Sequence, residues 1–339
     1  MKKDIGYIHI IRVVACIMVG FLHSLPSGEF VTDGFNSLFK RGIMLMTSPC
    51  VPLFFMITGI LILPIKTDIK TFYKKRIQKI LYPLLIWGII YATLPFFLGL
   101  QNISDTIKEI LICPLVWPSQ IGGILWYLYM LIGIYLIMPF ISSKLYTDRN
   151  YQKLYLILWL LSSLVWLIQM YEPRVLGLNP WEHNIHALSY FWGYLGFSIL
   201  GLYLDVNKSK TGGGKTILLY LITCFFMYIS QCYLGSNVSH WISSFISIPS
   251  VILSVILFRY IRGINISRKI YSIIKKISSL SFGIYLSHMV IYSCMTVNIY
   301  HFSTSWILQI LVFILTFLGA YFFSYILSKL SFSKYIIGI

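Results

Sequence analysis

The hydrophobic positions of this chain form long runs separated by short polar connections, and they do not alternate with polar positions. Each run is close to the roughly 20 residues that a helix needs to cross a bilayer, whereas β-barrel strands would alternate over about 10 residues. The pattern predicts an all-α integral membrane fold, a bundle of about ten transmembrane helices at residues 6–26, 43–64, 79–99, 124–142, 153–171, 187–204, 216–234, 241–260, 278–299 and 305–328.

The composition supports the same fold class. Hydrophobic residues make up 58% of the chain and charged residues 11%, whereas soluble domains carry about 25% charged residues. We expect residues 1–339 to form a single membrane domain with no soluble domain. The six cysteines show no paired spacing, so neither a disulfide framework nor a metal site is predicted.

The net charge of +17 would suit a nucleic-acid partner, but its distribution indicates membrane orientation instead. Of the 27 lysines and arginines, 22 lie in the N-terminal tail, in every second connection and in the C-terminal tail. The opposite set of connections holds only four. Because cytoplasmic loops carry the excess of basic residues, both termini are predicted to be cytoplasmic, and no nucleic-acid binding is expected.

Two polar side chains interrupt the first apolar run. Arg12 and His23 are eleven residues apart, nearly three helical turns, so they project from one face at a separation of roughly 16 Å. A cation in a membrane helix costs about 2.5 kcal/mol or more, which favours a polar cavity beside it. Guanidinium suits an anion such as phosphate, and imidazole suits proton transfer. The alternative is a histidine that only bonds neighbouring helices.

A second polar face lies in the ninth expected span. Ser281, Tyr285 and His288 follow each other at i, i+4 and i+7. With His23 at comparable depth, they could line a cavity shared by the two spans. A polar seam that joins neighbouring helices is the alternative interpretation.

Two further groups have a binding interpretation and a simpler one. The basic run between Lys66 and Lys79 could receive a polyphosphate, with Arg76 as the best candidate, although topology and anionic lipid also explain such runs. A group of residues on the outer side could form a sugar-facing surface, although an interfacial aromatic belt also explains its tryptophans. This group consists of Trp117, Trp181, Glu182, His183, Asn184 and His186.

Taken together, these motifs resemble acyltransferase family 3, the multi-span bacterial O-acyltransferases that modify surface carbohydrates. The first span matches the family's arginine, ten intervening residues and histidine. The other matching segments, in order, are VPLFFMITGILIL (51–63), KKRIQKILYPLLIW (74–87), LWYLYMLIGIYLIMPFI (125–141), FWGYLGFSILGLYL (191–204) and SFGIYLSHMVI (281–291).

The resemblance implies an O-acyltransferase, most simply an O-acetyltransferase, in the bacterial plasma (inner) membrane. It implies cytosolic acyl-CoA (acetyl-CoA) as donor and a surface polysaccharide or its lipid-linked precursor as acceptor. His23 would be the general base or a transient acyl acceptor. Arg12 and Arg76 would hold the donor phosphates. The acceptor side would be lined by His288, Tyr285 and Ser281.

The chain departs from the family pattern at two positions. His9 stands where members often have an aspartate three residues before the arginine, and Ile124 stands where they often have a histidine. A non-enzymatic transporter or exporter of a glycan or small polar solute is the alternative function. Transporters commonly show inverted repeats and broken helices, which are not found here, and this favours the enzyme.

Overall fold

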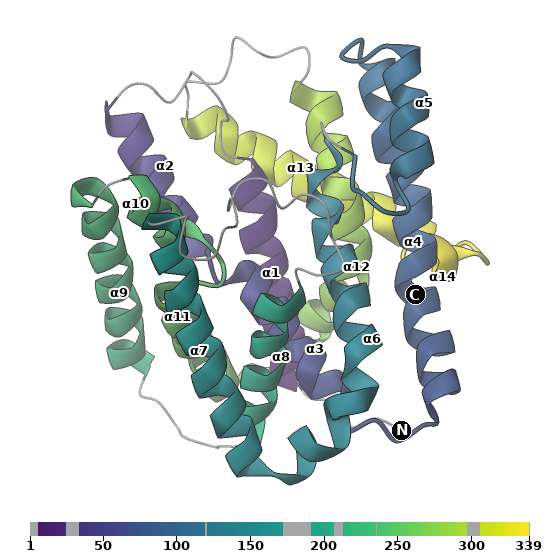
Figure 1. Ribbon diagram of the computed structural model, residues 1–339. Helices are drawn as coiled ribbons and strands as arrows, with labels where there is room; N and C mark the ends of the chain where they lie inside the picture. Colours follow the sequence, from purple (N-terminus) through teal and green to yellow (C-terminus); the bar gives the residue numbers. More distant parts are fainter. Residues whose placement is uncertain are drawn as a thin grey trace.

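The computed structural model describes residues 6–24, 34–118, 121–171, 191–206, 213–234, 236–296 and 306–338. Within these ranges the chain is a bundle of helices without strands (Figure 1). In chain order these are α1 (Gly6–His23), α2 (Gly34–Thr47), α3 (Cys50–Ile62), α4 (Ile69–Phe97), α5 (Ile103–Ile112), the 3-10 helix η2 (Gly122–Leu125), α6 (Trp126–Thr147), α7 (Arg149–Tyr171), α8 (Phe191–Val206), α9 (Gly213–Tyr233), α10 (Ser236–Ser243), α11 (Ile248–Gly263), α12 (Arg268–Thr296), α13 (Trp306–Leu327) and α14 (Ser333–Ile336).

The all-helical membrane fold expected from the sequence is confirmed, and each expected span has a helical counterpart. Among the described residues, eight segments are long and apolar enough to cross a membrane. The expected spans 153–171 and 187–204, which correspond to α7 and α8, are not among the eight. Both helices border residues 172–190, which lie outside the described ranges. The count of ten therefore stays a prediction.

Two connections between expected spans, residues 65–78 and 261–277, are largely helical. They extend α4 and α12 to 29 residues each, about 43 Å, which is longer than the roughly 30 Å of a bilayer core. Asp68 starts α4 by accepting a hydrogen bond from the backbone N–H of Thr71 at 2.8 Å, and this bond lowers the pKa of Asp68. Lysine and arginine are good helix formers, so the basic ends continue the spans.

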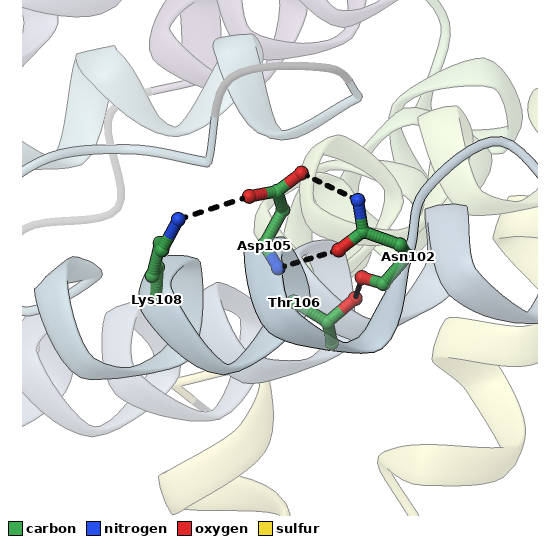
Figure 2. Close-up of polar contacts among 4 residues, drawn as sticks. All are labelled: Asn102, Asp105, Thr106 and Lys108. Carbon is green, nitrogen blue, oxygen red and sulfur yellow. Dashed lines mark hydrogen bonds and ion pairs between the residues drawn. The ribbon is translucent and has the colours of Figure 1, made fainter.

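The connection after α4, which was expected to be a loop, contains the helix α5. Figure 2 shows its start: the Asn102 side chain accepts from the Asp105 backbone N–H at 2.9 Å, and Lys108 pairs with Asp105 at 3.3 Å. On another face, an exposed apolar stripe recurs every four residues at Ile103, Ile107 and Leu111. This division into a polar and an apolar face makes α5 an amphipathic helix, and it runs alongside α4 (Figure 1).

Glycines let α3 and α8 approach closely in the middle of the bundle. A Cβ atom on Gly59 would lie 1.9 Å from the backbone oxygen of Ser198, and one on Gly201 would lie 2.2 Å from that of Met56. The Ser198 hydroxyl also donates to the backbone oxygen of Phe55 at 3.1 Å. Small residues at helix contacts are the usual means of tight packing in membranes, and here they bring the backbones of α3 and α8 into contact.

One end of α8 is held by an arginine from a neighbouring helix. Arg262 donates to the backbone oxygen of Leu204 at 2.5 Å and lies 3.7 Å from the carboxylate of Asp205. The same carboxylate accepts a hydrogen bond from the hydroxyl of Tyr7 on α1. The arginine therefore satisfies carbonyls at a helix C-terminus, where cations are stabilising, and joins α1, α8 and α11.

The glycine contact generates a stability prediction. Gly201→Ala should lower the free energy of unfolding by about 2 kcal/mol or more, because the new methyl group meets backbone atoms that cannot rotate away. Gly42→Ala on α2 is the matched control, since nothing lies within 4 Å of its Cβ position. The measurement is the fraction of detergent-solubilised protein that stays monodisperse after heating. Equal midpoints for the two variants would contradict the close approach.

Candidate active site

A central cavity of about 360 Å³ lies between α1, α3, α4, α6 and α12. Arg12 and His23, both on α1, line it together. Three other expected site residues, Arg76 from α4 and Ser281 and Tyr285 from α12, also line this cavity. The helical spacing along α1 and along α12 therefore directs the polar residues of distant segments to one space.

The guanidinium of Arg12 is half-buried and has no protein counter-ion. Among the described residues no carboxylate pairs with it and it makes no hydrogen bond. The hydroxyl groups of Tyr127 and Tyr135 on α6 interact with it electrostatically. A partly buried cation that is left unpaired beside a cavity is suited to binding an anionic ligand.

The imidazole rings of His23 and His288 lie against each other, with ring centroids 5.4 Å apart and planes tilted by 48°. The side chain of His288 is 3% exposed, and its Nδ1 lies 2.6 Å from the backbone oxygen of Tyr285. A carbonyl only accepts, so Nδ1 carries the proton and Nε2 is left as an acceptor. Among the described residues Nε2 has no hydrogen-bond partner.

The other residues of the α12 face are already engaged. The hydroxyl of Tyr285 donates to the backbone oxygen of Ile124, and the hydroxyl of Ser281 donates to the backbone oxygen of Ser278 at 2.9 Å. His288 does not line the central cavity but a much smaller void beside it, together with Tyr285. The Tyr285 bond joins α12 to η2, as expected for a polar seam, whereas the Ser281 hydroxyl bonds within α12. Both residues also line the central cavity, and His288 adjoins the cavity by its contact with His23.

A second cavity, of about 640 Å³, adjoins the first at the basic end of α4. We call it the basic cleft. Arg12, Leu61, Arg76 and Lys79 line both spaces, so the two cavities share a wall. The full lining of the basic cleft is Arg12, Leu61, Lys75, Arg76, Gln78, Lys79, Tyr82, Lys334 and Tyr335. The basic run therefore contributes Arg76 as expected, whereas Lys66, Lys70 and Lys74 do not line the basic cleft.

A family model described as an acyltransferase domain matches residues 5–328. That range contains His23, His288 and the wall of the central cavity except Gly338. The chain belongs to this acyltransferase family. No curated protein and no solved structure matches it. Together with its apolar helices, the family makes the chain a multi-pass membrane acyltransferase.

The two departures of this acyltransferase from the family pattern have definite surroundings. His9 turns to α12, where its Nδ1 lies 2.9 Å from the hydroxyl of Ser278 and its ring meets Tyr271 edge-on. It thus does not replace a carboxylate beside Arg12. Ile124 lies on the wall of the central cavity and holds Tyr285 through its backbone oxygen, so an apolar side chain stands there.

Aromatic residues at the His23 end of the central cavity were not identified as site residues from the sequence. Trp126 and Phe245 line it and are stacked, with centroids 6.0 Å apart and planes 15° apart. Trp117, for which the sequence left open a sugar-facing surface or an aromatic belt, meets the ring of Tyr129 edge-on and does not line the central cavity. The other members of that surface, Trp181, Glu182, His183, Asn184 and His186, lie outside the described residues.

The contrast between Arg12 and Arg262 generates a prediction. Arg12→Met should leave the free energy of unfolding unchanged or raise it by up to about 2 kcal/mol. The reason is that the substitution removes a half-buried charge that has no counter-ion among the described residues. Arg262→Met should lower it by about 2 kcal/mol or more, because Asp205 and two carbonyls lose their partner. Heat-induced loss of monodisperse protein measures both. Destabilisation by Arg12→Met as large as by Arg262→Met would make Arg12 a structural residue.

Proposed function

We propose that this acyltransferase transfers an acyl group, most simply acetyl, from cytosolic acyl-CoA to a hydroxyl of a surface polysaccharide or of its lipid-linked precursor. The observation that carries the proposal is the shared wall of the two cavities. Arg12, which has no counter-ion among the described residues, lines both the basic cleft with its cluster of cations and the central cavity with His23. An enzyme that takes a large anionic donor at one membrane face and delivers its acyl group deeper in the membrane needs such an arrangement.

The cations of the basic cleft serve the donor in this proposal. Arg12 and Arg76 line both cavities, and both bind phosphate groups of CoA, since guanidinium presents a planar fork of donors. His23 lies roughly 16 Å from Arg12 along α1. The narrow pantetheine arm spans this interval and brings the thioester to the histidine.

His23 is the general base of the proposed reaction. It takes the proton of the acceptor hydroxyl while the hydroxyl oxygen attacks the thioester carbonyl carbon. The carbon–sulfur bond then breaks, and the CoA thiolate leaves and recovers the proton from the imidazolium. The products are the ester and CoA thiol. The ring of His288 lies against that of His23, and its Nε2, which has no partner among the described residues, stabilises the imidazolium by accepting a hydrogen bond until the thiolate takes the proton.

The acceptor enters at the end of the central cavity lined by Trp126 and Phe245. Flat aromatic rings combined with few polar groups are typical of sites for small ligands, and they suit the apolar faces of a sugar ring. The excess of basic residues in the tails and in alternate connections supports a plasma membrane location with both termini cytoplasmic, because such residues stay inside. The donor cleft then opens to the cytosol.

The catalytic role of His23 is tested by His23→Ala. Labelled acyl transfer from acyl-CoA to a hydroxyl acceptor should fall by about 100-fold or more, because the positioned base is lost, while the protein remains inserted and folded. Ile17→Ala is the matched control, since Ile17 lies on the same helix with 41% of its side chain exposed and does not line either cavity.

Purified protein in vesicles separates the enzyme from a transporter. An enzyme consumes the thioester in a His23-dependent manner and leaves CoA on the side where it was added. A protein that moves a glycan intact, with the thioester untouched, would overturn the proposal in favour of a transporter. Normal transfer by His23→Ala at normal abundance would remove His23 from the mechanism.

Arg12→Lys tests the donor role. Lysine keeps the charge and loses the bidentate fork, so the KM for acyl-CoA should rise by about tenfold while the KM for the acceptor stays the same. Initial rates measured over both substrate concentrations give the two values. An unchanged KM for acyl-CoA would contradict phosphate binding by Arg12.

A further inference from the structure

The last residues of the chain form part of the wall of the basic cleft. In Figure 1, α13 runs obliquely across the bundle and leads to α14, which lies beside α4. The indole N–H of Trp87 on α4 donates to the backbone oxygen of Ile336 at 2.9 Å. The side chain of Ile337 is fully buried. The tail, residues 329–338, is therefore a packed element of the bundle.

Gly338 fixes the end of the tail between α4 and α12. Its φ of +69° is in the left-handed region that favours glycine. A Cβ atom there would lie 3.1 Å from the ring of Phe282 on α12 and 3.2 Å from the backbone oxygen of Lys79 on α4. Gly338 also lines the central cavity, so the tail follows the path from the basic cleft inward.

Two side chains of the tail, Lys334 and Tyr335, line the basic cleft. The Lys334 ammonium lies 4.7 Å from the centroid of the Tyr335 ring, and that ring meets Tyr82 of α4 edge-on at 5.1 Å. The lining of the basic cleft contains five basic side chains and no carboxylate among the described residues. Cations beside flat aromatic rings provide the chemistry that recognises a phosphorylated nucleoside.

We propose that the tail completes the donor site: Lys334 binds a phosphate of the adenosine 3′-phosphate 5′-diphosphate half of CoA, and Tyr335 packs against its purine. The inference rests on the proposed function and specifies which residues select a nucleotide-bearing donor. Lys75, Arg76 and Lys79 supply the remaining positive charge. Because the family match ends at residue 328, this part of the site is contributed by residues beyond the matched domain.

The test uses the full-length protein in phosphatidylcholine nanodiscs and measures equilibrium binding of CoA, adenosine 3′,5′-bisphosphate and acetyl-pantetheine. Lys334→Gln should weaken CoA binding by about fivefold, as expected for loss of one partly exposed charge pair. Tyr335→Ala should weaken it by about fivefold or more, whereas Tyr335→Phe should retain it, because the ring provides the stacking. None of these variants should change the binding of acetyl-pantetheine, which lacks the nucleotide.

Lys329→Gln is the matched control, because Lys329 belongs to the same tail, lies over the ring of Tyr325 and does not line the basic cleft. Unchanged CoA affinity for both Lys334→Gln and Tyr335→Ala, with normal binding by the wild type, overturns the inference and leaves the acyltransferase proposal intact. Equal weakening of CoA and acetyl-pantetheine also overturns it, because the tail then acts only on folding.

A further outcome separates the proposed nucleotide site from the proposed acyl-transfer reaction. Lys334-dependent binding of adenosine 3′,5′-bisphosphate by a protein that consumes no thioester supports the nucleotide site and rejects the proposed reaction. The basic cleft could instead bind added phosphatidylglycerol and neither CoA nor the bisphosphate. In that case the basic cleft holds lipid headgroups, and the inference is overturned.

Discussion

An unpaired guanidinium on a membrane helix is the constraint on which this structure depends. Arg12 costs about 2.5 kcal/mol or more in a bilayer, and among the described residues no carboxylate offsets that cost. The bundle accommodates it by surrounding it with a cavity and with the hydroxyls of Tyr127 and Tyr135. The position of α1 against both cavities follows from this need, because the charge must remain accessible to water or to an anion.

The rest of the bundle stays rigid around that opening. Gly59 and Gly201 bring α3 and α8 into backbone contact, and Arg262 joins α1, α8 and α11 through Asp205. Arginine thus stands in two different environments in this chain. Arg262 is paired with protein groups and holds helices together, whereas Arg12 has no counter-ion among the described residues, and we propose that it binds the donor. Pairing within the fold, rather than sequence position, separates these two arginines.

The site also shows how charge is graded along one path. The basic cleft has five cations, the central cavity keeps Arg12 at its inner part, and the end at His23 is lined by aromatic and apolar side chains such as Trp126 and Phe245. In the proposed reaction this gradient places the anionic donor at the basic end and the ester-forming step at the less polar end.

The sequence alone determined the fold class, the shared helical faces and the family of this protein. The length of the apolar runs predicted a helical membrane bundle, and the spacing of Arg12 and His23 predicted a shared face, because a helix repeats every 3.6 residues whatever surrounds it. The same local periodicity placed Ser281 and Tyr285 together. The ordered motifs also identified the family, since the match to residues 5–328 depends on sequence only.

Tertiary structure decided what those faces meet. His23 and His288 are 265 positions apart, and their contact depends on how α1 packs on α12. The hydroxyls of Tyr285 and Ser281 turned out to be bound to backbone oxygens, and α5 occupies a connection expected to be a loop. Apart from the positive charge of Lys334, nothing in the sequence indicated that Lys334 and Tyr335 line a cavity. The tail reaches the basic cleft only because of the course of α13 and the hydrogen bond from Trp87. Local periodicity determines which side chains share a face, but only long-range packing determines which faces share a cavity.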